Sequence, residues 1–229
     1  MTAENTAPAP TQVIRRVRMI YTRGEALRYV SHLDFQLVWE RTFRRARLPL
    51  AFSQGFNPRP RMHLASALPL GFLSRCEIVD VWVVDESGAA SAGEFAQRVA
   101  ELAQRAAPPG LAITRAEDVP LSEPALQTRV SAAEYFALPL DPLDLSEVQA
   151  KAQELLSAET LPRERRGKAY DLRPLIHAFE ARELNGCAGF FMRLSARESA
   201  TGRPEEALSA LGFDPAAFRV ERTNLLLES

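Results

Sequence analysis

Three segments of the chain carry apolar residues at the spacing of an amphipathic α-helix. Residues 92–106 and 145–157 repeat them every third or fourth position, and residues 204–211 form a shorter stretch that opens with proline. Positions three and four apart fall on one face of a helix, and proline is favoured in the first turn. We therefore predict helices over these three segments.

A fourth helix is expected after Ser31, which is a good N-cap because its hydroxyl can accept a backbone N–H of the first turn. Asp34 follows three positions later and places a carboxylate where the helix dipole favours negative charge. From Phe35 onward, apolar side chains gather on one flank and arginines on the opposite flank. The helix should end at Pro49, packing one side and presenting the other to solvent or phosphate.

Strands are predicted where β-branched and alternating residues run between turn-forming residues. These runs are residues 13–19, 50–53, 61–68, 77–84, 111–116, 130–138, 190–196 and 218–227, with strand and turn within 163–179. Together with the helices, and leaving aside the short run 50–53, the first half has the order β-α-β-β-α-β, and the second half repeats it loosely. The expected fold is α+β, with tandem ferredoxin-like domains of which the second is irregular.

The predicted domain boundaries follow changes in composition. Residues 1–12 are small, polar and proline-bearing, which is typical of a disordered leader. An N-terminal domain over 13–118, a linker over 119–128 and a C-terminal domain over 129–229 account for the rest. The sequence has neither a long apolar run nor a hydrophobic signal core, so we expect a cytoplasmic protein without membrane attachment.

The formal net charge of −1 hides an asymmetry along the chain. Residues 1–75 hold 12 arginines and no lysine against four carboxylates, a net charge of +8, whereas the remainder holds 16 basic and 25 acidic residues, a net charge of −9. A basic block in an otherwise acidic protein favours a polyanionic partner, because each arginine that meets a phosphate releases counterions. We predict that this partner is RNA.

The loop over residues 53–61 is the strongest single candidate site. A glycine allows close approach of a ligand, two prolines stiffen the backbone, and Phe56 offers a stacking face. Arg59 and Arg61 offer guanidinium groups for phosphate, and His63 should share a strand face with Arg61. This composition suits single-stranded RNA. The alternative is a structural turn in which Phe56 fills the core.

The predicted RNA-binding residues lie on the helix after Ser31, in this loop and in a second basic segment at 163–173. They are Arg41, Arg44, Arg45, Gln54, Phe56, Asn57, Arg59, Arg61, His63, Arg165, Arg166 and Lys168. The prediction depends on these groups sharing one exposed hollow.

Histidines are the candidate catalytic residues if the protein is instead an enzyme. His32 follows the N-cap, where the helix dipole should lower the pKa of its imidazole, and His63 lies near arginines that could stabilise a charged phosphorane. Either could act as general acid or base in a metal-independent endoribonuclease. His177 adjoins an apolar run and is expected to be structural.

Metal and cofactor chemistry are not expected. Cys76 and Cys187 are far apart and have no CxxC partner, which argues against a cysteine-rich zinc site or an iron–sulfur cluster. The sequence contains no P-loop, dinucleotide-binding glycine turn, zinc HExxH or nucleophile elbow. An autonomous cofactor enzyme is therefore disfavoured.

Several short motifs occur in order between Tyr29 and Gly71: SHLD, an arginine-rich helix, SQGFNP and ALPLG, with SRCEIVDVWV, YDLRPLI and VERTNLL further on. This series resembles the signature region of the radical-SAM-linked protein family. The resemblance implies an accessory protein encoded beside, or fused to, a radical S-adenosylmethionine protein with a cobalamin-type domain. The family often carries histidine and lysine where this chain has Arg59 and Arg61. The CxxxCxxC of a radical-SAM enzyme is absent here.

We therefore expect a non-catalytic RNA-binding partner of a radical-SAM/cobalamin-type protein, which holds tRNA or rRNA for that protein. Two alternatives stay open. One is the endoribonuclease that uses His32 or His63, because the tandem ferredoxin-like order also resembles the CRISPR repeat-processing endoribonucleases. The other is a protein scaffold whose acidic second domain docks the radical-SAM protein.

Overall fold

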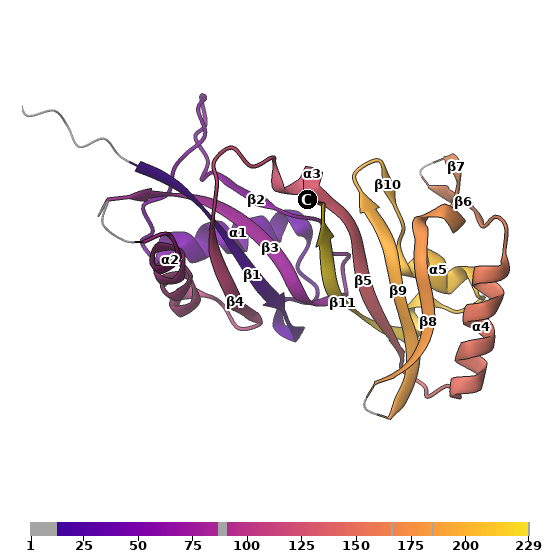
Figure 1. The fold of residues 1–229 in the computed structure, drawn as a ribbon. Helices are drawn as coiled ribbons and strands as arrows, with labels where there is room; N and C mark the ends of the chain where they lie inside the picture. The colour runs from indigo at the N-terminus through magenta and orange to yellow at the C-terminus, as the bar shows by residue number, and fades with distance from the viewer. Residues whose placement is uncertain (1–12, 87–90, 166, 185, 229) are drawn as a thin grey trace, which may run out of the picture.

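The computed structural model describes residues 13–86, 91–165, 167–184 and 186–228, so the predicted leader at 1–12 lies outside the described residues. Nine strands form one mixed sheet in the order β10-β9-β5-β11-β3-β1-β4, with β2 paired to β3 and β8 paired to β9 (Figure 1). A separate two-stranded sheet consists of β6 (Pro162–Arg165) and β7 (Lys168–Asp171). The large sheet is mostly antiparallel and runs through both halves of the chain.

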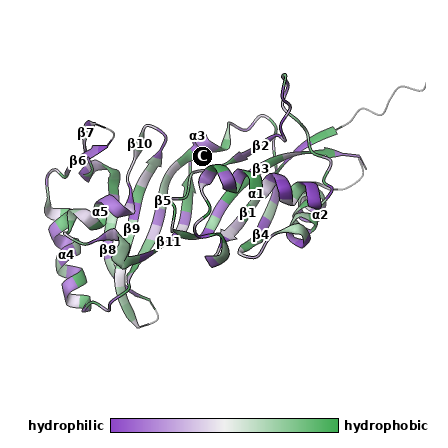
Figure 2. Ribbon diagram, turned by 180° about the vertical axis from the view of Figure 1, so that it is seen from behind, coloured by the Kyte–Doolittle hydropathy of each residue, from purple (hydrophilic) through white to green (hydrophobic). Residues whose placement is uncertain are grey.

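The first half places two helices on one face of its strands. Its elements are β1 (Val13–Arg23), a 3-10 turn (Glu25–Leu27), α1 (His32–Arg45), β2 (Met62–Leu64), β3 (Leu73–Asp85), α2 (Ala92–Ala106) and β4 (Leu111–Val119). Their strands pair in the order β4-β1-β3-β2. The core between helices and strands contains Val17, Met19 and Tyr21 of β1, Trp39 of α1 and Val99 of α2. Figure 2 shows α1 lying across these strands.

The second half pairs its four long strands in the corresponding order, β11-β5-β9-β8. Its elements are α3 (Leu126–Arg129), β5 (Val130–Pro139), α4 (Leu145–Ser157), β6, β7, a 3-10 turn (Arg173–Leu175), β8 (Ile176–Leu184), β9 (Cys187–Arg197), β10 (Ala200–Thr201), α5 (Pro204–Ala210), a 3-10 turn (Pro215–Ala217) and β11 (Phe218–Leu227). Val148 and Leu155 of α4 pack into a core with Phe179 of β8 and Phe190 of β9. The apolar face of α4 therefore packs against these strands.

The two halves meet where two strands share one edge of β3. β11 runs parallel to the start of β3, with Glu221 opposite Leu73 and Arg222 opposite Ser74. Further along the same strand, β2 pairs with residues Val79 to Val81 in the antiparallel sense. This arrangement makes β3 the strand that connects both halves of the sheet.

β3 is buried on both faces, which explains its almost continuous apolar sequence. Val79, Val81 and Val83 pack against the helices, whereas Ile78 and Trp82 point to the opposite face and are also buried. Alternating side chains of a strand point to opposite faces, so the second face needs a cover of its own.

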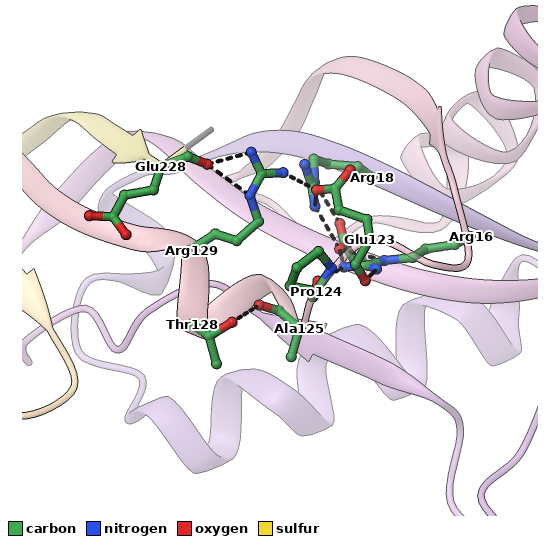
Figure 3. A network of polar contacts seen from close by, with 9 residues as sticks. Arg16, Arg18, Glu123, Pro124, Ala125, Thr128, Arg129 and Glu228 are labelled. Carbon is green, nitrogen blue, oxygen red and sulfur yellow. Dashed lines mark hydrogen bonds and ion pairs between the residues drawn. The ribbon is translucent and has the colours of Figure 1, made fainter.

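Residues 120–129, called here the crossing segment, provide part of that cover. Asp80 of β3 accepts hydrogen bonds from Arg16, at 2.9 and 2.5 Å, and from Arg18, at 2.8 and 3.0 Å. Arg16 also donates to the backbone carbonyl of Glu123 at 2.6 Å, and Arg18 forms a 2.9 Å ion pair with the Glu123 carboxylate. Figure 3 labels Arg16, Arg18, Glu123, Pro124, Ala125, Thr128, Arg129 and Glu228 in this network. Buried guanidinium groups thus hold the crossing segment on the sheet.

Helices followed the sequence pattern more closely than strands did. α2 and α4 have the predicted bounds, and Ser31 caps α1 by accepting a hydrogen bond from the backbone N–H of Asp34. The prediction that α1 ends at Pro49 was wrong, because the helix ends at Arg45 and Arg47 adopts a left-handed conformation with φ of 54°.

Two predicted strands of the first half are shorter than expected. The segment 61–68 is a strand only at Met62–Leu64, and the segment 50–53 forms only isolated bridges. The length of an edge strand depends on the room left beside its neighbour, and β11 occupies the beginning of β3. Among the described residues, no helix combines the length and apolar character needed to cross a membrane.

Candidate functional site

A cleft of about 1080 Å³ lies between the two halves of the protein and is called here the central cleft. The first half contributes the N-terminal turn of α1 and residues 62–70, and the second half contributes the β6–β7 hairpin and residues 196–205. Tyr135 of β5 and Arg222 of β11 also line it. Its volume lies just above the range of about 300–1,000 Å³ that is typical of pockets for small organic ligands.

Arg222 is buried in the lining of the central cleft, and the carboxylate of Glu77 balances its positive charge. Its Nη1 donates to the carboxylate of Glu77 at 2.9 and 3.1 Å, and its Nη2 donates to the carbonyl of Ala67 at 2.7 Å and to the hydroxyl of Tyr135 at 3.3 Å. Both Arg222 and Glu77 are less than 5% exposed. The Nε of Arg222 is buried and has no hydrogen-bond partner among the described residues. One N–H donor of this side chain is therefore unsatisfied.

His32 and His63 both line the central cleft. Burial lowers the pKa of His32, and the charges of Arg23 and Arg222 act in the same direction, against the opposing effect of Glu77. The pKa of His32 is lowered, as predicted, but the main cause is burial and not the helix dipole. His63 and His32 are therefore expected to be mostly neutral near pH 7, since burial lowers the pKa of His63 as well.

His63 lies against Trp82, with ring centroids 4.9 Å apart, and its buried Nδ1 has no partner among the described residues. The guanidinium of Arg61 lies 4.4 Å from the centroid of the same Trp82 ring. Arg61 directly precedes β2 and is not in the strand, but both side chains contact the same Trp82 ring, as their alternate spacing predicted. His177 is exposed on β8 and is not part of the cleft lining.

Arg165 of the second-half wall is held by neighbouring groups. Its guanidinium donates to the carboxylate of Glu206 at 2.6 Å and to the hydroxyl of Tyr170 at 3.2 Å. Lys168 and Arg203 also line the central cleft, are exposed, and form no ion pair with any described residue. Among the described residues of this wall, Lys168 and Arg203 are thus exposed cations that remain available to a ligand.

Glu205 follows Arg203 at the start of α5 and lines the same cleft. Burial raises the pKa of its carboxyl group, while the positive charge of Arg203 opposes this rise. Its Oε2 is buried and has no hydrogen-bond partner within the described part of the chain. An unsatisfied buried oxygen costs free energy, which a ligand donor or a water molecule would recover.

Residues 51–61, called here the projecting hairpin, rise away from the sheet just before β2 (Figure 1). The backbone N–H of Ser53 donates to the carbonyl of Arg59 at 2.9 Å and closes the turn. Phe56 at the tip is completely exposed, so the alternative in which this ring fills the core is wrong. Arg59 is exposed and forms no ion pair with a described residue.

The structure divides the predicted RNA-binding residues among three places. His63, Arg165 and Lys168 line the central cleft; Gln54, Phe56, Asn57, Arg59 and Arg61 belong to the projecting hairpin; Arg41, Arg44 and Arg45 are exposed on α1. Arg166 lies outside the described residues. Neither the hairpin side chains nor the α1 arginines line the central cleft, so the single shared hollow that was expected is not found there.

Part of the basic charge in the first half is structural. Arg16 and Arg18 are buried on Asp80, and Arg23 is buried with its guanidinium on the carbonyls of Leu27 and Val30. The charge count could not show this, because the carboxylate of Asp80 comes from β3 and the carbonyls of Leu27 and Val30 from the segment after β1. The net charge of +8 therefore overstates the charge that a ligand can meet.

Sequence reasoning missed Arg203, Glu205 and Arg222. A signal for Arg222 was available, because Phe218, Val220 and Arg222 alternate along β11 and all three are buried. An arginine in phase with apolar residues indicates a buried ion pair. Arg203 and Glu205 had no such signal, since their position in the cleft depends on how α5 packs.

These features define a mixed α/β protein whose two halves share one sheet and border an open cleft lined by both polar and apolar side chains. The chain belongs to the family described as "Uncharacterized protein conserved in bacteria (DUF2344)", which matches residues 16–204. No curated protein matches the sequence. Within the described residues, no group of three or more histidine, cysteine, aspartate or glutamate side chains could hold a metal ion.

Proposed function

We propose that this protein binds single-stranded segments of tRNA or rRNA and presents them to a radical-SAM/cobalamin-type partner. We also infer that its two halves are tandem ferredoxin-like units, because each half pairs its strands in the order fourth-first-third-second. Sheets of this kind occur in RNA-binding modules, although a fold alone does not define a function.

The projecting hairpin is the observation that carries the RNA proposal. Phe56 is fully exposed at the tip of the hairpin, and an exposed aromatic ring can stack on any base. Arg59 offers an unpaired guanidinium three residues from Phe56, and Arg61 is oriented by its contact with Trp82 instead of by a carboxylate. These three side chains supply a stacking surface and two phosphate contacts on one hairpin.

Phe56→Ala is expected to weaken binding of an unstructured RNA oligonucleotide by about 1–3 kcal/mol, roughly 5- to 150-fold in Kd, because one stacked base is lost. Arg59→Ala/Arg61→Ala should lower the slope of log K against log salt by about 0.7 for each phosphate contact removed. Fluorescence anisotropy of a labelled RNA at several salt concentrations measures both effects.

The matched control is Arg98→Ala/Arg105→Ala, which removes two exposed arginines from α2 and changes the net charge equally. This control should leave affinity and salt slope almost unchanged. Absence of RNA binding at low salt, or equal losses in the control and the hairpin variants, would contradict the proposal.

The endoribonuclease alternative gains support from one observation, since His32 and His63 line the same cleft. General acid–base catalysis by two histidines needs one imidazole to be protonated. Burial lowers both pKa values, which disfavours the protonated form at neutral pH. We therefore rank RNA binding first. RNA that stays intact during long incubation with the protein in EDTA would remove this alternative.

A row of exposed apolar side chains supports a protein partner. Leu33 and Leu37 lie one turn apart on α1 and are 74% and 42% exposed, and Tyr29 and Leu70 are also exposed. Exposed apolar groups that gather in one region are typical of protein interfaces. The resemblance to the radical-SAM-linked family supplies the proposed identity of the partner.

Leu33→Asp/Leu37→Asp is expected to reduce capture of the radical-SAM/cobalamin-type protein from the same genome by about tenfold or more, because charges would replace apolar contacts. Affinity purification of the tagged chain after nuclease treatment measures this capture. Leu121→Asp/Leu140→Asp, which changes two exposed leucines elsewhere, serves as control. Equal capture by wild type and the α1 variant would argue against this docking surface.

A further inference from the structure

Three cleft-lining side chains have buried polar atoms without a partner among the described residues. They are His63 through Nδ1, Glu205 through Oε2 and Arg222 through Nε. Buried polar groups in proteins are nearly always hydrogen-bonded, so each exception calls for a group that satisfies it. Because the three come from β2, α5 and β11, the central cleft collects them only in the folded chain.

The chemistry of these atoms selects among possible ligands. The Nε of Arg222 is a donor, the carboxyl of Glu205 is an acceptor when ionised, and neutral imidazole nitrogen can take either role. An inorganic anion would be repelled by Glu205 and could not satisfy it. A planar heterocycle whose edge carries both N–H donors and carbonyl or ring-nitrogen acceptors offers both of these roles, and nucleobases have such edges.

The second-half wall adds a place for negative charge. Lys168 is opposite Arg165 in the β6–β7 register. The guanidinium of Arg165 donates to the carbonyl of Thr201 at 3.0 Å, and Thr201 is two residues before Arg203. The charge of Arg165 is offset by Glu206, whereas Lys168 and Arg203 have no ion-pair partner in the described ranges. These exposed cations can bind the phosphate that a nucleotide carries beside its base.

We propose that the central cleft binds a single nucleotide, with its base at His63, Glu205 and Arg222 and its phosphate at Lys168 and Arg203. In an RNA this would be a nucleotide turned out of its stack, as occurs when a base is presented for chemistry. The choice of ligand class rests on the proposed RNA binding. The cleft and the projecting hairpin are nevertheless separate surfaces, so each can be tested without the other.

Calorimetric titration of the full chain with AMP, CMP, GMP and UMP, each up to about 5 mM, tests the proposal. At least one nucleotide should bind, and its nucleoside and inorganic phosphate should each bind about tenfold more weakly, because each supplies only half of the contacts. Glu205→Gln, which replaces one oxygen acceptor by an amide, should weaken nucleotide binding by about tenfold. Lys168→Ala should weaken binding of the nucleotide but leave that of the nucleoside unchanged.

Glu198→Gln is the matched control, since Glu198 is exposed, lines the same cleft and loses the same charge. The proposal is overturned if no nucleotide binds, if phosphate alone binds as well, or if both glutamate variants weaken binding equally. Hairpin-dependent RNA binding without nucleotide binding would remove this inference and keep the proposed function. Nucleotide binding without RNA binding would keep this inference and remove the proposed function.

Discussion

Replacing Arg222 by alanine is expected to lower the free energy of unfolding by about 3–5 kcal/mol, which is a large part of the stability of a typical domain. The substitution leaves the carboxylate of Glu77 buried without its counter-ion and removes the donors to Ala67 and Tyr135. It also removes the side chain that fixes β11 beside β3. Urea unfolding followed by circular dichroism measures the loss.

Two further variants separate the ion pair from general effects on β11. Arg219→Ala removes an exposed arginine of the same strand, which pairs with Glu25, and should cost less than about 1 kcal/mol. Arg222→Met/Glu77→Met removes both charges together and should recover much of the loss, because no unpaired charge stays buried. If Arg222→Ala were as stable as Arg219→Ala, the buried pair would not have the role assigned to it.

Asp80→Asn is expected to have a comparable effect, about 3–5 kcal/mol, because one carboxylate neutralises two buried guanidinium groups. Arg18 keeps its ion pair with Glu123, but Arg16 loses its only carboxylate partner among the described residues. The crossing segment depends on both arginines (Figure 3), so its attachment should weaken first. Hydrogen exchange of residues 120–129, together with urea unfolding, measures this change.

Glu180→Gln is the control for Asp80→Asn, since it removes a carboxylate from a half-exposed pair with Arg182. Its expected cost is below about 1 kcal/mol, with no change in exchange over the crossing segment. Faster exchange throughout the sheet, without an earlier change at residues 120–129, would contradict the proposed role of Asp80.

The candidate site was predicted only in part. The exposed aromatic loop could be predicted because glycine, proline and asparagine in Ser53–Arg61 define a turn locally. The roles of Arg16 and Arg18 could not be predicted, because their partner Asp80 is more than 60 positions away in the sequence. An arginine looks the same in a sequence whether it meets phosphate, water or a buried carboxylate.

The sequence by itself determined the start of α1 and the bounds of α2 and α4, but neither the end of α1 nor the short helix α3. Ser31 caps α1 through a contact three residues away, and the periodicity of α2 and α4 is sufficient to place their ends. Only the tertiary structure decided the central cleft, which brings His32 of α1 near Arg222 of β11. Helix signals are local because hydrogen bonds join residues four apart, whereas the cleft depends on which distant strands pair and in what register.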